Sequence, residues 1–132
     1  MKILLDTHVF IWAIMGDPRL TQLQRELYTD KRNELFLSVA SVWEIVIKAG
    51  LGKLRMPVPI VSFVDRQLRQ NRISLLKIHL SHLAALETLP PLHRDPFDRL
   101  LVAQAKAEGL RILSEDSKLS GYGVPMLPEN PA

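Results

Sequence analysis

Four short apolar runs, separated by longer segments with helical periodicity, dominate this sequence. The runs are Lys2–Leu5, Leu35–Val39, Ile73–Ile78 and Leu110–Leu113. Apolar runs of this length, bounded by polar residues, are typical of strands that are buried on both faces. Strands that alternate with helices pair in parallel, because each crossover needs a helix to return the chain to the same edge. The sequence therefore predicts an α/β fold, with a central, mainly parallel sheet of four to five strands flanked by helices.

The segments between these runs carry recognisable helix limits. We expect helices over Val9–Met15, Leu20–Asp30, Ser41–Ala49, Ile60–Arg72, Leu80–Leu89 and Pro96–Glu108. Gly109 stands where a glycine cap would end the last helix, and Lys53–Pro59 is expected as a loop. Val124–Leu127 is expected as a fifth strand at the edge of the sheet. With 132 residues, the chain is expected to form one domain over residues 1–132.

Composition excludes several classes of protein. The chain has no cysteine, which excludes disulfides, thiolate zinc sites and cysteine nucleophiles. With 47% hydrophobic residues it is not disordered. The longest apolar run, Val9–Met15, is too short to span a bilayer, and Asp6 interrupts the apolar stretch that a signal peptide would need. We therefore expect a cytoplasmic protein without a membrane segment.

Acidic residues follow the strands at the points where the strands end. Asp6 comes directly after the first strand, and Glu44 is expected in the first turn of the helix after the second. Asp95 and Asp98 bracket the start of the helix that leads into the fourth strand, and Asp116 follows that strand. Because the carboxyl ends of parallel strands share one edge of the sheet, these five acids are predicted to lie on a common rim.

Each acid has an alternative role as a helix cap. Ser41-x-x-Glu44 has the spacing of a capping box. Asp95 before Pro96 has the pattern of an N-cap with proline at the first helical position, where Asp98 would favour the helix dipole. The acids after the first and fourth strands could cap the turns that follow them. Capping alone gives no reason for the acids to share one edge.

Clustered carboxylates repel one another, and this repulsion raises their pKa values and lowers stability unless a cation lies among them. Oxygen ligands without cysteine select hard ions such as Mg²⁺ or Mn²⁺. Such an ion supports phosphodiester hydrolysis, because it polarises a phosphoryl oxygen and lowers the pKa of an attacking water. The sequence therefore predicts a metal-dependent phosphodiesterase site on this rim.

The balance of charge suits a polyanionic substrate. The chain has 17 basic and 14 acidic residues, a formal net charge of +3. Without the five rim acids, the rest of the chain is strongly basic, which favours contact with a phosphate backbone. A solvated surface is the alternative for each basic residue. The basic residues close to the rim in sequence are Lys48, Lys53, Arg55, Arg94, Arg99 and Lys118.

Several motifs together resemble the PIN-domain family, and within it the VapC-like ribonuclease toxins of bacterial type II toxin–antitoxin pairs. The resemblance covers nearly the whole chain, in order. Its motifs are Leu4-Leu5-Asp6-Thr7-His8-Val9, Ser38-x-x-Ser41-x-x-Glu44-Ile45, Arg94-Asp95-Pro96-Phe97-Asp98-Arg99-Leu100-Leu101 and Ser114-Glu115-Asp116.

This resemblance implies a PIN-like three-layer fold and Mg²⁺- or Mn²⁺-dependent cleavage of RNA. The family's acidic constellation falls on Asp6, Glu44, Asp98 and Asp116, which become the expected catalytic and metal-binding residues. Asp95 is then a helix cap or an auxiliary ligand. The resemblance also implies a homodimer and a cognate antitoxin that occludes the site. Substrate contacts are expected from Thr7, Lys48 and Arg99.

Other interpretations stay open. A DNase would use the same chemistry, since no residue pattern here reads a 2′-hydroxyl, and a non-catalytic protein-binding or regulatory domain could keep the same fold. Structural or surface roles are expected for the histidines, with a substrate contact as the alternative for His8 and His93, which flank rim acids. Core or dimer contacts are expected for both tryptophans. These residues are His8, His79, His82, His93, Trp12 and Trp43.

Overall fold

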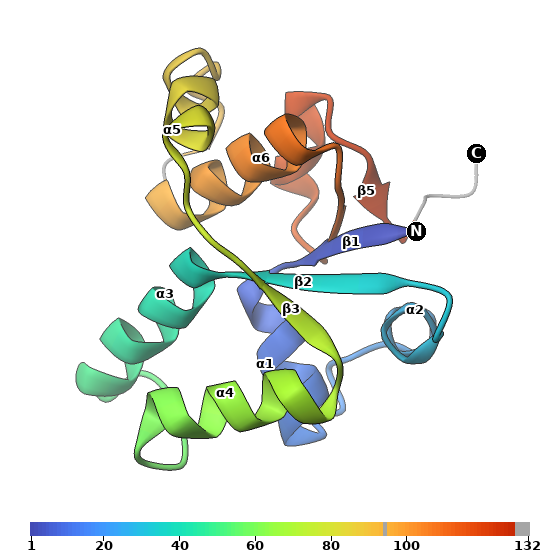
Figure 1. Ribbon diagram of the computed structural model, residues 1–132, viewed down its shortest axis with the longest axis vertical. Helices are drawn as coiled ribbons and strands as arrows, with labels where there is room; N and C mark the ends of the chain where they lie inside the picture. The colour runs from blue at the N-terminus through green and yellow to red at the C-terminus, as the bar shows by residue number, and fades with distance from the viewer. Residues whose placement is uncertain (94, 129–132) are drawn as a thin grey trace.

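The computed structural model of the chain describes residues 1–93 and 95–128, with the backbone alone at residues 117, 118 and 120. Its strands form one parallel sheet in the order β3-β2-β1-β4-β5, which confirms the predicted sheet (Figure 1). The strands are β1 (Lys2–Leu5), β2 (Glu34–Ser38), β3 (Ile73–Leu76), β4 (Arg111–Leu113) and β5 (Met126–Leu127).

Helices cover both faces of this sheet. α1, α3 and α4 lie on one side, whereas α5, α6 and the 3-10 helix η1 lie on the other (Figure 1). Within the described chain, no helix has the length and apolarity needed to cross a membrane. The helices are α1 (Thr7–Met15), α2 (Gln22–Thr29), α3 (Val39–Gly50), α4 (Ile60–Gln70), α5 (Leu80–Glu87), α6 (Pro96–Glu108) and η1 (Ser117–Tyr122).

The central strand β1 is covered by helices on both faces, which explains its run of apolar residues. Ile3, Leu4 and Leu5 are all fully buried. Ile3 and Leu5 pack in the core on one face of the sheet, and Leu4 packs in the core on the other. Successive side chains of a strand point to opposite faces, so a strand covered on both sides must be apolar on both. The three-layer arrangement follows from this pattern.

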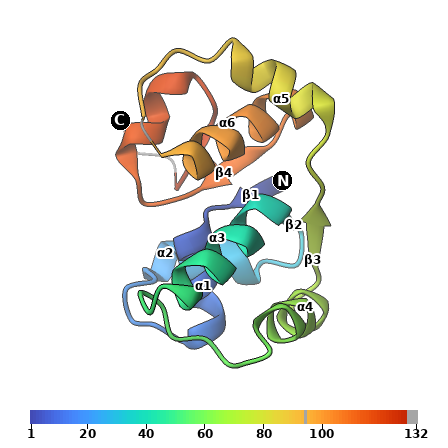
Figure 2. The same cartoon turned by 90° about the vertical axis from the view of Figure 1, so that its left-hand side faces the viewer.

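The chain order creates a crevice beside β1. The chain first builds β2 and β3 outward on one side of β1, then crosses to form β4 and β5 on the other. Ligands of open parallel sheets bind where the strand order reverses, outside the carboxyl ends of the strands. Here that point lies between β1 and β4, where Leu5 pairs with Leu113. Figure 2 looks onto this edge, from which α3 and α6 begin.

Two helices begin earlier than the sequence pattern indicates. α1 begins at Thr7 rather than Val9, and α3 begins at Val39 rather than Ser41. For α3 the reason is its N-cap, because the Ser38 hydroxyl accepts a hydrogen bond from the backbone N–H of Ala40 at 3.0 Å. The cap therefore ends β2 and starts the helix without an intervening loop.

The other limits agree more closely with prediction. α6 spans Pro96–Glu108 as expected, and Gly109 ends it at φ 67°, a left-handed conformation that glycine adopts without strain. α4 ends at Gln70, ahead of Arg72, which has a φ of 55° and so cannot continue a helix. α2, α5, β3, β4 and β5 are also shorter than predicted at their ends, where hydrophobic patterns continue beyond the regular backbone.

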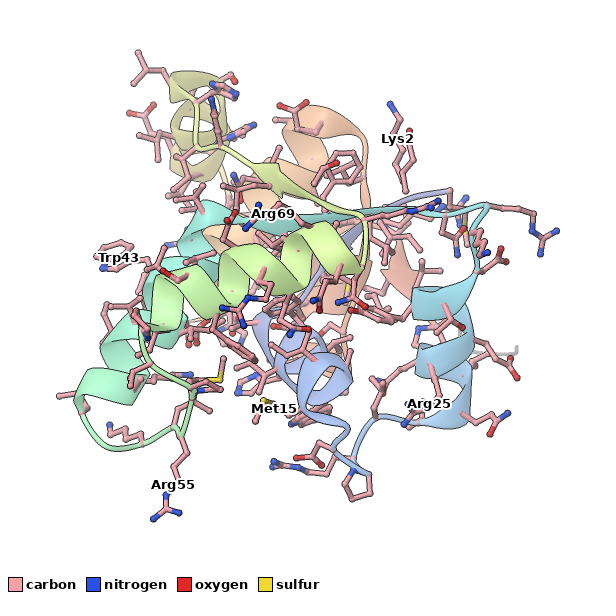
Figure 3. The ribbon with its side chains drawn as sticks, turned by 60° about the horizontal axis from the view of Figure 1, so that its bottom comes forward. Lys2, Met15, Arg25, Trp43, Arg55 and Arg69 are labelled. Atoms are coloured by element: carbon pink, nitrogen blue, oxygen red, sulfur yellow. The ribbon has the colours of Figure 1, made fainter. Side chains whose placement is uncertain are left out.

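Three residues with an uncertain role are placed by the fold. Trp12 is buried in the core, which was one of its two expected roles. Trp43 is 58% exposed and projects from α3 (Figure 3), with its ring edge-on to Phe97 at 5.2 Å, so a core role is wrong for this tryptophan. His82 is buried and its Nε2 lies 2.7 Å from Oε1 of Glu108, an acid partner that comes from α6. This pairing gives His82 a structural role.

Candidate metal centre and active site

Asp6 leaves β1 with its carboxylate buried at the crevice. It occupies the N-cap position of α1, yet its side chain makes no capping hydrogen bond, so the capping role is wrong for this residue. Instead Oδ2 accepts a hydrogen bond from the Ser114 hydroxyl at 2.5 Å. The residue is only 3% exposed, and its Oδ1 is buried without a hydrogen-bond partner among the residues that the structure describes. Burial raises the pKa of Asp6, although the Ser114 hydrogen bond opposes this rise.

Glu44 reaches the same crevice from the second turn of α3. The prediction of a first-turn position is wrong because the helix begins at Val39, and the predicted capping box does not form because Ser38, not Ser41, is the N-cap. The Ser41 hydroxyl instead accepts a hydrogen bond from Thr7 Oγ1 at 2.8 Å. Glu44 is 3% exposed. Its Oε2 accepts a hydrogen bond from Lys48 Nζ at 2.6 Å, which raises the pKa of the lysine. Its Oε1 is buried and has no hydrogen-bond partner in the described part of the chain.

The two acids at the start of α6 have different roles. Asp95 is the N-cap, because its Oδ1 accepts hydrogen bonds from the backbone N–H of Phe97 at 2.8 Å and of Asp98 at 3.2 Å. Asp98 lies in the first turn of α6, and its side chain is 17% exposed. Burial, and then the nearby charges of Asp6 and Asp95, raise the pKa of Asp98 to about 7. The capping role is therefore confirmed for Asp95, and Asp98 lies in the electrostatic field of the other acids.

His93 lies between the last two acids. Its Nε2 is 3.2 Å from Oδ2 of Asp116 and 3.4 Å from Oδ2 of Asp98. Its Nδ1 accepts a hydrogen bond from the backbone N–H of Asp95 at 3.0 Å. An accepting Nδ1 carries a lone pair, so the hydrogen of the neutral imidazole is on Nε2. His93 is therefore a donor that holds the two carboxylates together, and its ring nitrogens are both engaged.

These contacts join residues that are distant in sequence. The Asp116 carboxylate lies 23 positions from His93, and only the fold brings them together. The backbone N–H of His93 in turn donates to the Tyr122 hydroxyl at 2.8 Å, which anchors the loop before α6 on η1. The backbone N–H of Asp116 donates to Ser114 Oγ at 3.0 Å. Ser114 thus contacts both acids that follow β1 and β4.

The donor set of this crevice fits a hard divalent cation. Within residues 1–93 and 95–128, the buried carboxylate oxygens Asp6 Oδ1 and Glu44 Oε1 have no hydrogen-bond partner, and an unpaired buried acceptor is unfavourable. A cation would supply the missing partner. Carboxylate oxygens of Asp98 and Asp116 lie within 4.8 Å of each other, and Nε2 of His93 lies within that distance of both. Because oxygen ligands dominate, the set is suited to Mg²⁺ or Mn²⁺ rather than to softer ions.

The residues expected to contact the substrate lie around this crevice in different settings. Thr7 is buried and Lys48 is held by Glu44. Arg99 turns away, because its Nη2 donates to the backbone carbonyl of Leu89 at 3.3 Å. Two of the basic residues expected near the rim fall outside the described parts of the chain, namely Arg94 and the side chain of Lys118.

The fold and the acidic crevice define a class of protein. The sequence pattern of the PIN domain matches residues 3–124, and the chain belongs to the PIN-domain family. Among relatives, it is 42% identical to Ribonuclease VapC16 of Mycobacterium tuberculosis over 60 residues, which span 46% of this chain and 43% of that protein. It is 27% identical to Ribonuclease VapC22 of the same organism over 124 residues, 93% of each chain.

Solved structures share the fold. VapBC2 from Rickettsia felis, bound to a DNA fragment from its promoter, matches with a TM-score of 0.71 and 19% identity over 96% of this chain and 97% of that one. DNA-bound VapBC from Salmonella typhimurium matches with a TM-score of 0.70 and 17% identity over 96% of each chain. At these identities the likeness establishes the fold.

Proposed function

We propose that this PIN-domain protein is a metal-dependent endoribonuclease that hydrolyses RNA phosphodiester bonds in the cytoplasm. The observation that carries the proposal is the pair of buried, unpartnered carboxylate oxygens of Asp6 and Glu44 beside Asp98. Carboxylates in this arrangement destabilise the folded chain unless a cation lies among them. The choice of RNA is supported by the names of the relatives, which are ribonucleases.

In this proposal Asp6 and Asp98 bind Mg²⁺ or Mn²⁺ directly, and Glu44 and Asp116 complete the site. The bound cation supplies Lewis acidity, which polarises the phosphoryl oxygen and lowers the pKa of the attacking water. Asp95 stays the cap of α6, because its Oδ1 is occupied by two backbone N–H groups. It contributes negative charge to the site without acting as a ligand.

Three further side chains keep the carboxylates in place. Ser114 holds one oxygen of Asp6 and leaves the other without a hydrogen bond to the described residues. Lys48 does the same for Glu44. His93 fixes the spacing of the carboxylates that follow it in sequence. Groups of this kind orient metal ligands and strengthen metal binding.

We further propose that the protein is the toxin of a toxin–antitoxin pair and acts as a homodimer. Relatives named VapC and structural neighbours that are VapBC assemblies support a protein partner. An acidic crevice on a basic chain suits a partner that inserts an arginine or lysine side chain into it. Expression of the chain alone should then arrest growth, and co-expression with the protein encoded beside it should relieve the arrest.

The nuclease activity is tested with purified protein and fluorescent RNA. Mg²⁺ or Mn²⁺ should support cleavage, EDTA should stop it, and Asp6→Asn should lower the rate at least ~10²-fold, as expected on loss of a central electrostatic group. Single-stranded DNA of the same sequence is the comparison substrate. Cleavage of the DNA alone, or an Asp6→Asn variant as fast as the parent, would contradict the proposal.

A further inference from the structure

A hollow of about 340 Å³ lies beside the acidic crevice, between the start of α1, α3 and the loop that follows α3. Thr7, the neighbour of Asp6, lines it, and so does Lys48, the partner of Glu44. The hollow is therefore lined by residues that neighbour or contact the acids of the crevice. Its volume is near the lower end of the range for ligand pockets, which is enough for one nucleotide-sized group.

The rim of this hollow is cationic. Lys48, Lys53 and Arg19 all line it. Lys48 forms an ion pair with Glu44, and the Arg19 guanidinium forms one with Asp17 at 2.7 Å. Lys53 forms no ion pair within residues 1–93 and 95–128, so its charge is available to a ligand. An anion can lie here without displacing an internal contact of Lys53.

The floor of the hollow is apolar and aromatic. Ile11, Ile45 and Leu54 line it together with Trp12. Trp12 is buried beneath two groups, the Arg19 guanidinium at 5.0 Å from the ring centroid and the His8 ring at 6.1 Å. His8 itself is exposed and lines the hollow, so its imidazole is open to a flat partner. Flat rings stack on aromatic side chains whatever their base identity.

We propose that this hollow is a subsite for one nucleotide of the RNA strand, next to the phosphodiester that is cleaved. The phosphate of that nucleotide contacts Lys53, and its base stacks on His8 against the apolar floor. This inference rests on the proposed nuclease function, because the substrate strand has to pass from the acidic crevice into the hollow. An acidic peptide would satisfy Lys53 but would make no use of the open imidazole face, so the hollow favours RNA.

Binding is tested in an inactive background, Asp98→Asn, with a fluorescein-labelled single-stranded RNA and anisotropy over a series of NaCl concentrations. Each phosphate contact of a single strand contributes about 0.7 to the slope of log K against log salt. Lys53→Ala should lower affinity several-fold and reduce the slope by about that amount. Arg55→Ala is the matched control, because Arg55 lies in the same loop and points away from the protein (Figure 3), and it should leave the slope unchanged.

The base contact has its own signature. His8→Ala should lower affinity several-fold without a change in slope, and His8→Phe should restore the affinity because a flat ring is restored. Circular dichroism and melting temperature check that each variant folds. Equal losses of slope in Lys53→Ala and Arg55→Ala, or an unaltered affinity in His8→Ala, would overturn the proposal. Stronger competition by a poly-glutamate peptide than by unlabelled RNA would also overturn it, in favour of a protein ligand.

The two proposals can fail separately. RNA cleavage is measured with Asp98 intact, whereas the subsite is measured by binding alone. If the parent cleaves RNA and Lys53→Ala binds with parental affinity and slope, the subsite is wrong and the nuclease stands. If the binding pattern holds and the parent cleaves no RNA with either metal, the nuclease is wrong, and the hollow remains an RNA-binding site with no cleaved phosphodiester beside it.

Discussion

Ser114 donates a hydrogen bond to Oδ2 of Asp6 at 2.5 Å, across 108 positions of sequence. The contact joins the carboxyl ends of β1 and β4, the two strands on either side of the point where the strand order reverses. It keeps one oxygen of Asp6 occupied and leaves Oδ1 unpartnered. Because a hydrogen bond to the ionised form favours it, Ser114 also counters part of the rise in the pKa of Asp6 that burial causes.

Loss of the Ser114 hydroxyl should therefore move metal binding to higher pH. In Ser114→Ala the pKa of Asp6 rises further, and metal binding needs the ionised carboxylate. Calorimetric titration with Mn²⁺ between pH 5.5 and 8 should show weaker binding in the variant, with the largest difference at the acidic end. Ser62→Ala, at an exposed position on α4, is the control and should follow the parent. Identical pH profiles for Ser114→Ala and the parent would contradict this role.

Removal of the His93 side chain should weaken metal binding about 10- to 100-fold, the range for groups that orient metal ligands. The reason is that Asp98 and Asp116 lose the donor between them. His93→Gln keeps an N–H donor and should retain most of the affinity, which distinguishes positioning from simple packing. Mn²⁺ titration of both variants, without substrate, provides the measurement. Parental affinity in His93→Ala would exclude the positioning role.

Lys48 is expected to stabilise the metal-free fold through Glu44. Lys48→Met leaves a buried carboxylate with both oxygens unpartnered, which should lower the free energy of unfolding by roughly 1–3 kcal/mol in EDTA. The matched control is Arg69→Met on α4, since Arg69 forms an exposed pair with Asp65 at the same spacing, and exposed pairs contribute less than about 1 kcal/mol. Urea unfolding measures both. Equal losses in the two variants would contradict the buried-pair argument.

Local patterns predicted the sheet, α6 and its cap, because each depends on residues that are neighbours in sequence. Pro96 and Gly109 mark the limits of α6, and Asp95 caps it as its pattern indicated. The parallel sheet then placed the carboxylates on one edge. The sequence pattern predicted Glu44 in the first turn of α3, whereas it lies in the second turn. The reason is that Ser38, not Ser41, is the N-cap of this helix.

Contacts between distant elements could not be predicted in this way. His93 lies in a loop without periodicity, and its partner Asp116 follows a different strand. Ser114 carries no signal of its own beyond its place after β4. The exposed position of Trp43 was also hidden, because an apolar helix face looks the same in sequence whether another element covers it or not. These side chains are positioned by tertiary packing alone.

The last prediction separates a metal cluster from a set of caps by stability. The side chain of Asp95, not that of Asp98, caps α6. Burial and the charges of Asp6 and Asp95 raise the pKa of Asp98 to about 7. Asp98→Asn removes one charge from the cluster, so the melting temperature in EDTA at pH 7.5 should rise while RNA cleavage is lost. Asp65→Asn, at an exposed site on α4, is the control and should leave both unchanged.

The sign of the pH dependence follows from the same pKa. An unfolded chain releases the Asp98 proton near pH 4, whereas the folded protein holds it until about pH 7. Between these values the folded state binds more protons, so the stability of the metal-free protein should be greatest at low pH in this window and should fall as pH rises through 7. Mg²⁺ should offset the loss, most strongly at pH 7.5, where the ligands are ionised.

Thermal melting of the parent and of Asp98→Asn, at pH 5 and pH 7.5 and with EDTA or Mg²⁺, measures both the pH dependence and the effect of the cation. If the melting temperature of the parent does not respond to Mg²⁺ and Asp98→Asn is less stable in EDTA, the metal site is contradicted. Asp98 would then act only through its favourable interaction with the dipole of α6.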